Sequence, residues 1–176
     1  MKLFLLVILL ALSFAAAAQS SKSYNGNLAI QPDAFRIAFN AALEAEGAAF
    51  RANAGTKPKC EGTTCNVIYP LSDAIIMSTI TNKSDGSVRV ILLLATLDAK
   101  EADMRIKMPQ AMRGLVKAVT PMIPIEERTK AVDDLTGRAL KSKDMTGRYI
   151  RNGVRYIFGG IPGTGMMFTV QREDGK

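Results

Sequence analysis

Apolar residues recur at two different spacings, and the spacing changes several times along the chain. From Pro32 to Ala49 they repeat every three or four residues, which is the period of one face of an α-helix. Between residues 67 and 97 the pattern changes to alternation, which is typical of β-strands. Three strands are expected there, at residues 67–69, 74–81 and 87–97. The Asp85-Gly86 pair predicts a hairpin between the last two strands.

The second half of the chain shows the same change of period. Helical spacing returns from Asp103 to Thr120, with Pro109 either inside the first turn or kinking a longer helix. It continues from Pro124 to Gly137, where the glycine is expected to end the helix. Strands are then predicted at residues 145–151, 154–158 and 166–171. Asn152-Gly153 predicts a tight hairpin between the first two.

The predicted order of elements is therefore α-βββ-αα-βββ. This order favours the α+β class, as a single domain with an antiparallel sheet and helices on one face. Alternation in the third strand would place Val88, Val90, Leu92 and Leu94 on one face, and Arg89, Ile91, Leu93 and Ala95 on the other. Because both faces are largely apolar, we expect this strand to be central in the sheet.

The N-terminal residues follow a third pattern. Lys2 precedes an apolar run and then the small residues Ala16-Ala17-Ala18, which together indicate a secretory signal cleaved before Gln19. An uncleaved anchor is the alternative, but the apolar run is shorter than the roughly 20 residues that span a bilayer. The predicted organisation is a signal peptide at 1–18, a flexible leader at 19–31 and one α+β domain at 32–176. The predicted location is the periplasm or the medium of a bacterium.

Signal removal has little effect on composition. The formal charge falls from +7 to +6, because Lys2 is the only charged residue removed. This net positive charge favours anionic partners. The most apolar remaining window, residues 88–97, is too short to span a membrane, so no membrane span is predicted after cleavage.

The only two cysteines are Cys60 and Cys65, with Gly62 between them. In an oxidising compartment such a pair is expected to close a small disulfide loop. A redox-active pair is the alternative, but the spacing is not Cys-x-x-Cys.

The absence of histidine from the sequence excludes Ser-His-Asp and Cys-His triads and most zinc sites. Adjacent carboxylates such as Glu126-Glu127 are interpreted as residues of a first helical turn rather than as an acid–base pair. The glycine-rich segment 159–165 lacks the ending of a phosphate loop and is expected to connect two strands. We therefore predict no catalytic residue, no metal and no cofactor, and the protein is expected not to be an enzyme.

Positive charge concentrates in one segment of the C-terminal half. Its basic residues are Arg138, Lys141, Lys143, Arg148, Arg151 and Arg155. Tyr149 and Tyr156 are interleaved, as in sheets that bind nucleic acid, but no nucleic-acid fingerprint accompanies them. The simplest interpretation is a solvated sheet face. The functional hypothesis is an exported, non-enzymatic interaction or accessory protein whose basic C-terminal sheet region meets an anionic envelope polymer or an acidic protein.

A second hypothesis comes from the methionines. Met104, Met108 and Met112 lie at helical spacing, where methionine commonly fills a core. Alternatively, they could line an apolar pocket in a small periplasmic carrier that holds its ligand between helices and sheet.

Overall fold

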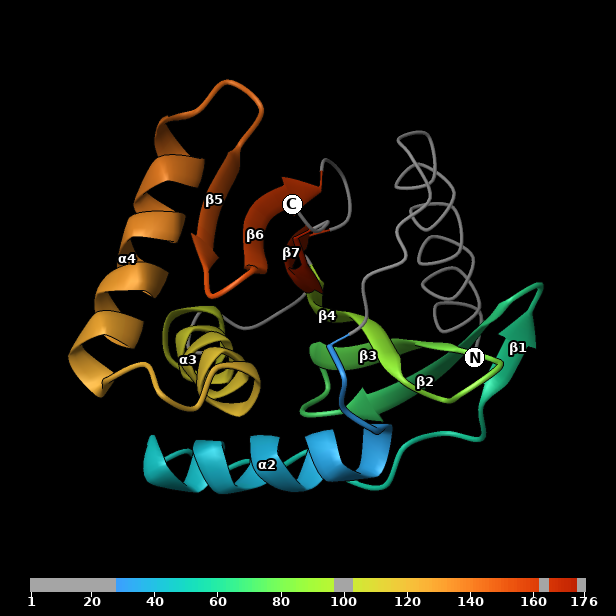
Figure 1. Ribbon diagram of the computed structural model, residues 1–176. Helices are drawn as coiled ribbons and strands as arrows, with labels where there is room; N and C mark the ends of the chain where they lie inside the picture. The colour runs from blue at the N-terminus through green and yellow to red at the C-terminus, as the bar shows by residue number, and fades with distance from the viewer. Residues whose placement is uncertain (1–27, 97–102, 162–164, 174–176) are drawn as a thin grey trace.

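The computed structural model describes residues 28–96, 103–161 and 165–173, and forms a single antiparallel sheet with three α-helices (Figure 1). The helical elements are α2 (Pro32–Ala45), η2 (Asp103–Lys107), α3 (Met108–Val119) and α4 (Ile125–Lys141). The strands are β1 (Lys59–Glu61), β2 (Thr64–Pro70), β3 (Ile75–Asn82), β4 (Val88–Thr96), β5 (Thr146–Arg151), β6 (Val154–Ile161) and β7 (Gly165–Arg172). The predicted signal peptide at 1–18 lies outside the described residues.

The predicted α+β class and order of elements are confirmed. The strands lie in the order β1-β2-β3-β4-β7-β6-β5, so β4 is the central strand, as its two apolar faces indicated. The sequence predicted six strands, and the structure adds β1. This three-residue strand pairs with the start of β2 and places Cys60 opposite Cys65, where the predicted disulfide forms with an S–S distance of 2.03 Å.

The first helix ends earlier than predicted. The sequence analysis extended it to Ala49, but α2 stops at Ala45 because Gly47 adopts a left-handed backbone with a φ of 68°. The Gly47 and Ala48 amides donate to the carbonyls of Glu44 and Leu43, at 3.0 and 2.9 Å. These two bonds form a Schellman motif, which terminates a helix at glycine.

The fourth helix runs past its predicted end. Gly137 was expected to stop the helix, but α4 continues through it for another turn to Lys141. Ala139 in this extra turn is buried, so packing outweighs the weak helix propensity of a single glycine. Directly before α3, residues 103–107 form the π-helix η2, and Pro109 lies in the first turn of α3, where a missing amide hydrogen is tolerated.

The predicted faces of β4 need one correction. Val88 was expected to share a face with Val90, but the register shifts between Ile80 and Thr81, so that Ile80 opposes Val90 and Thr81 opposes Val88. This β-bulge turns Val88 to the same side as Ile91, where both are fully buried. The alternation holds from Val90 onward.

Two local features connect the sheet to its surroundings. Asn152 and Gly153 form the predicted tight hairpin, and their φ values of 52° and 71° are the two positive values that a type I′ turn requires. At the same end of the strands, where Leu28 and Asn152 line one hollow, the Leu28 amide donates to the Val88 carbonyl and the Val88 amide donates to the Ile30 carbonyl. The packed domain therefore begins inside the segment predicted as a flexible leader.

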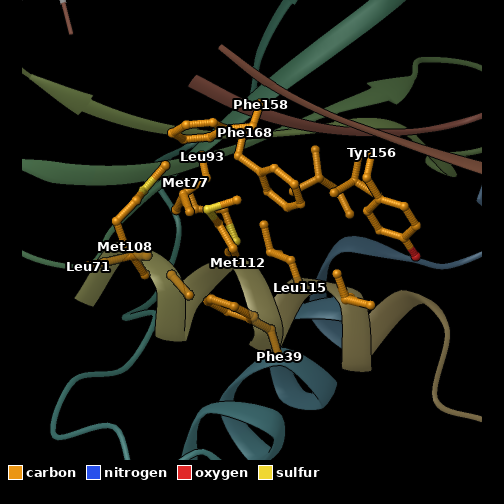
Figure 2. Close-up of a cluster of buried hydrophobic side chains, with 14 of the residues drawn as sticks. Phe39, Leu71, Met77, Leu93, Met108, Met112, Leu115, Tyr156, Phe158 and Phe168 are labelled. Atoms are coloured by element: carbon orange, nitrogen blue, oxygen red, sulfur yellow. The ribbon is translucent and has the colours of Figure 1, made fainter. Parts of the chain in front are cut away.

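One face of the sheet carries the core, and we call it the covered face. Figure 2 shows Met112 and Leu115 of α3 directed toward Leu93 and Phe168 of the sheet, with Phe39 of α2 on the other side of the helix. At the edge of the sheet that β5 forms, α4 lies against this strand. A Cβ atom at Gly147 would overlap the carbonyl of Leu135, so only glycine permits this close approach.

Candidate functional site

The opposite face of the sheet, which we call the open face, carries many aliphatic side chains, and no helix of the described residues packs on it (Figure 1). Cross-strand register arranges its apolar side chains in three rows: Pro70, Ile76, Leu94 and Met167; Ile68, Leu92 and Ile157; Ile80, Val90 and Ile150. All of them are at least partly exposed, and Ile150 reaches 49%.

The rows extend over six neighbouring strands, from β2 to β5. With strands about 4.8 Å apart and rows about 7 Å apart, the patch measures roughly 25 by 15 Å between Cα positions. Three polar residues lie within it, of which Ser78 and Thr169 are buried between their neighbours and Gln171 is partly exposed. Patches of roughly 300–600 Å² are the largest that monomeric proteins usually expose, and such patches are often functional.

The structure divides the predicted basic residues between the two faces. Arg148 opposes Ile157, and Arg155 opposes Ile150, so both arginines belong to the open face. Arg155 also pairs with Glu173 at 3.6 Å. These two cations form one border of the aliphatic rows.

Arg151 lies on the covered side instead. Its Nε contacts Glu127 of α4 at 3.1 Å, and Tyr149 donates a hydrogen bond to the same carboxylate at 3.1 Å. Burial and then this hydrogen bond raise the pKa of Tyr149. Glu127 is in the first turn of α4, as predicted, but it also attaches the helix to β5. Arg151 and Glu127 lie far apart in the sequence, so the sequence pattern did not indicate that they form an ion pair.

The other three basic residues surround the end of α4. Arg138 and Lys141 are in its last turn, and Lys143 is exposed in the following loop. Arg138 donates from Nη1 to the Arg148 carbonyl at 3.3 Å, which brings these two residues together at the free edge of β5. In the same loop, a hydrogen bond from Ser142 lowers the pKa of Asp144.

The candidate apolar pocket is not seen around the methionines that the structure describes. Met108 and Met112 are buried in the core and packed among sheet side chains (Figure 2). The Met104 side chain lies outside the described part of the structure. Two surface hollows, of about 590 and 270 Å³, lie over α4 and beside the α3–α4 loop, and neither is lined by Met108 or Met112.

A buried ion cluster joins the three α-helices, and sequence reasoning did not find it. Glu46, just after α2, accepts hydrogen bonds from Arg113 Nε at 2.7 Å and from Arg128 Nη2 at 3.1 Å. Arg128 also donates to the Ile123 carbonyl at 2.7 Å. The Glu46 and Arg128 side chains are almost inaccessible to water, so each charge depends on its partners.

A second buried polar contact lies between α3 and the sheet. The hydroxyl groups of Thr120 and Tyr156 are 2.8 Å apart, and Thr120 Oγ1 also donates to the Val116 carbonyl. Burial raises the pKa of Tyr156 to about 12. This pair joins the C-terminal end of α3 to β6 inside the core.

Comparison with protein-family models, with curated proteins and with solved structures gives no match to this chain. Among residues 28–96, 103–161 and 165–173, no helix is long and apolar enough to cross a membrane. In the same ranges, no group of three or more Cys, Asp or Glu side chains is arranged to hold a metal ion.

Proposed function

We propose that this chain is an exported, non-enzymatic interaction or accessory protein whose basic C-terminal sheet region meets an anionic partner. The observation that carries this proposal is the position of Arg148 and Arg155 on the open face, beside uncovered aliphatic side chains. The disulfide is compatible with an oxidising periplasm or medium. Arg138, Lys141 and Lys143 extend the positive potential past the end of α4.

An interaction of this kind should depend on ionic strength. The basic groups are exposed or partly exposed, so salt screens them over about 8–10 Å at physiological concentration. Cations at the border of an interface accelerate encounter and select partners of opposite charge. We therefore expect binding to weaken as salt is raised.

The test is capture of partners from an envelope extract at low and high salt, using the mature chain and three variants. Combined Arg148→Gln and Arg155→Gln substitution should reduce salt-sensitive capture at least tenfold, because both arginines that border the aliphatic rows are lost. Arg151→Gln removes one positive charge from the covered side and is the control for the single Arg148→Gln variant, which removes one from the open face. Equal capture by the double variant and the unsubstituted chain at both salt concentrations would refute the proposal.

Export can be tested separately. Mass spectrometry of the secreted chain should give an N-terminus at Gln19, if the alanine-rich segment is the cleavage site. The alternative function, a carrier of an apolar ligand, is supported by no observation here, because Met108 and Met112 pack in the core.

A further inference from the structure

We infer that the anionic partner is a protein, and that it covers the open face with an apolar surface bordered by carboxylates. This inference rests on the proposed function and specifies the class of partner. It follows from the fact that Arg148 and Arg155 do not stand alone on an otherwise polar face. Each opposes an isoleucine across the β5–β6 ladder, at the end of the rows of aliphatic side chains.

The aliphatic side chains distinguish a protein from an anionic polymer. A polyanion would neutralise the arginines, but it would leave residues such as Leu92, Leu94 and Ile76 in water. A protein surface can exclude water from these aliphatic side chains and contact the arginines in the same interface. At roughly 25 by 15 Å, the patch is about half of the roughly 800 Å² that each partner contributes to a standard protein interface, so we expect a small contact that also includes the arginines.

The charges of the open face also argue against a second copy as the occupant. The opposite end of the face carries Lys59 and Glu61, which lie in register with Asn66 and Thr64. A twofold dimer of facing sheets would place the arginines against the same arginines or against this mixed end. Neither arrangement brings an excess of negative charge to the basic border, whereas an acidic partner does.

Three synthetic probes separate the contributions of charge and apolar surface. The first is an amphipathic helical peptide with leucine on one face and glutamate on the other, and the second replaces each glutamate with lysine. The third is polyglutamate, which has the charge without the apolar face. Binding to the mature chain is measured by fluorescence anisotropy. We expect the leucine–glutamate peptide to bind at least tenfold more tightly than either of the others.

Variants then place the contact on the open face. Combined Leu92→Thr and Leu94→Thr substitution should weaken binding of the leucine–glutamate peptide at least tenfold. The matched control is Leu140→Thr, because this leucine is 83% exposed on α4, away from the sheet. Thermal unfolding of each variant is measured alongside, and circular dichroism must show the native fold. Equal binding by the open-face double variant and the control would overturn the inference.

The remaining outcomes distinguish this inference from the proposed function. If polyglutamate binds as tightly as the leucine–glutamate peptide, the anionic partner survives and the apolar protein contact is refuted. If neither anionic probe binds better than the leucine–lysine peptide, both proposals fail. If light scattering shows a dimer that the Leu92→Thr, Leu94→Thr variant dissociates, a second copy covers the face and the inference is overturned.

Discussion

The covered and open faces of the sheet contain similar aliphatic residues, but their surroundings differ. In β4, Leu92 and Leu93 are consecutive, yet Leu93 is fully buried beneath α3 (Figure 2). Leu92 is partly exposed on the open face. Side-chain alternation along one strand produces this difference. Burial by helices therefore assigns one face to stability, and the other is the face on which we propose that a partner binds.

The largest effect is expected from the ion cluster that holds the helices over the covered face. Glu46→Gln should lower the free energy of unfolding by about 3–5 kcal/mol, because it leaves the buried Arg128 without its carboxylate. Urea denaturation measures this change. Glu44→Gln is the control, since its exposed pair with Arg51 should contribute less than about 1 kcal/mol. Similar decreases in the free energy of unfolding for the two variants would show that the buried cluster contributes no more to stability than an exposed ion pair.

The comparison between faces can be tested at two adjacent positions. Leu93→Ala should lower the free energy of unfolding by about 3 kcal/mol, because it removes buried methyl groups and leaves a cavity in the core. Leu92→Ala should cost roughly 1 kcal/mol or less, since its side chain is already partly hydrated. Urea unfolding of both variants provides the measurement. If the two costs were equal, the open face would be as covered as the other.

A pH titration tests whether the covered face excludes water. The pKa of Tyr156 is about 12 when folded, against an ordinary value of 10.0, so folding favours the neutral phenol. The contribution of the Tyr156 phenol to the free energy of unfolding is complete below pH 10 and is lost as the pH rises toward 12. The free energy of unfolding should fall by roughly 3 kcal/mol across that window. In Tyr156→Phe this part of the decline should be absent, and an unchanged decline would assign it to other groups.

Most of the fold could be predicted because its signals are local. Changes of hydrophobic period located nearly every element, and Asn152-Gly153 fixed a hairpin. The errors occurred where tertiary contacts decide the local structure. Burial of Ala139 carries α4 through Gly137, and a register shift redirects Val88. Three-residue β1 is too short to produce a periodic pattern.

The candidate site was less accessible to prediction. Clustering in sequence identified the basic segment, but it could not show that Arg151 faces α4 while Arg148 and Arg155 face outward. The open face is assembled from six strands, so its extent depends on strand order and register. Apolar residues on both sides of one strand indicated a central position, and the order of elements favoured helices on one face, but neither signal showed which side of each strand the described helices cover.

The pairing of β4 with β7 also has a consequence for the order of folding. Within the described sheet this ladder is the only link between the two halves of the chain, and Val90 and Gln171 lie about eighty residues apart in sequence. The meander of each half can form from neighbouring segments, whereas the central ladder must close a long loop. Until β7 arrives, β4 is a long apolar edge strand that can template association between chains. Completion of the C-terminal half therefore protects the N-terminal half from aggregation.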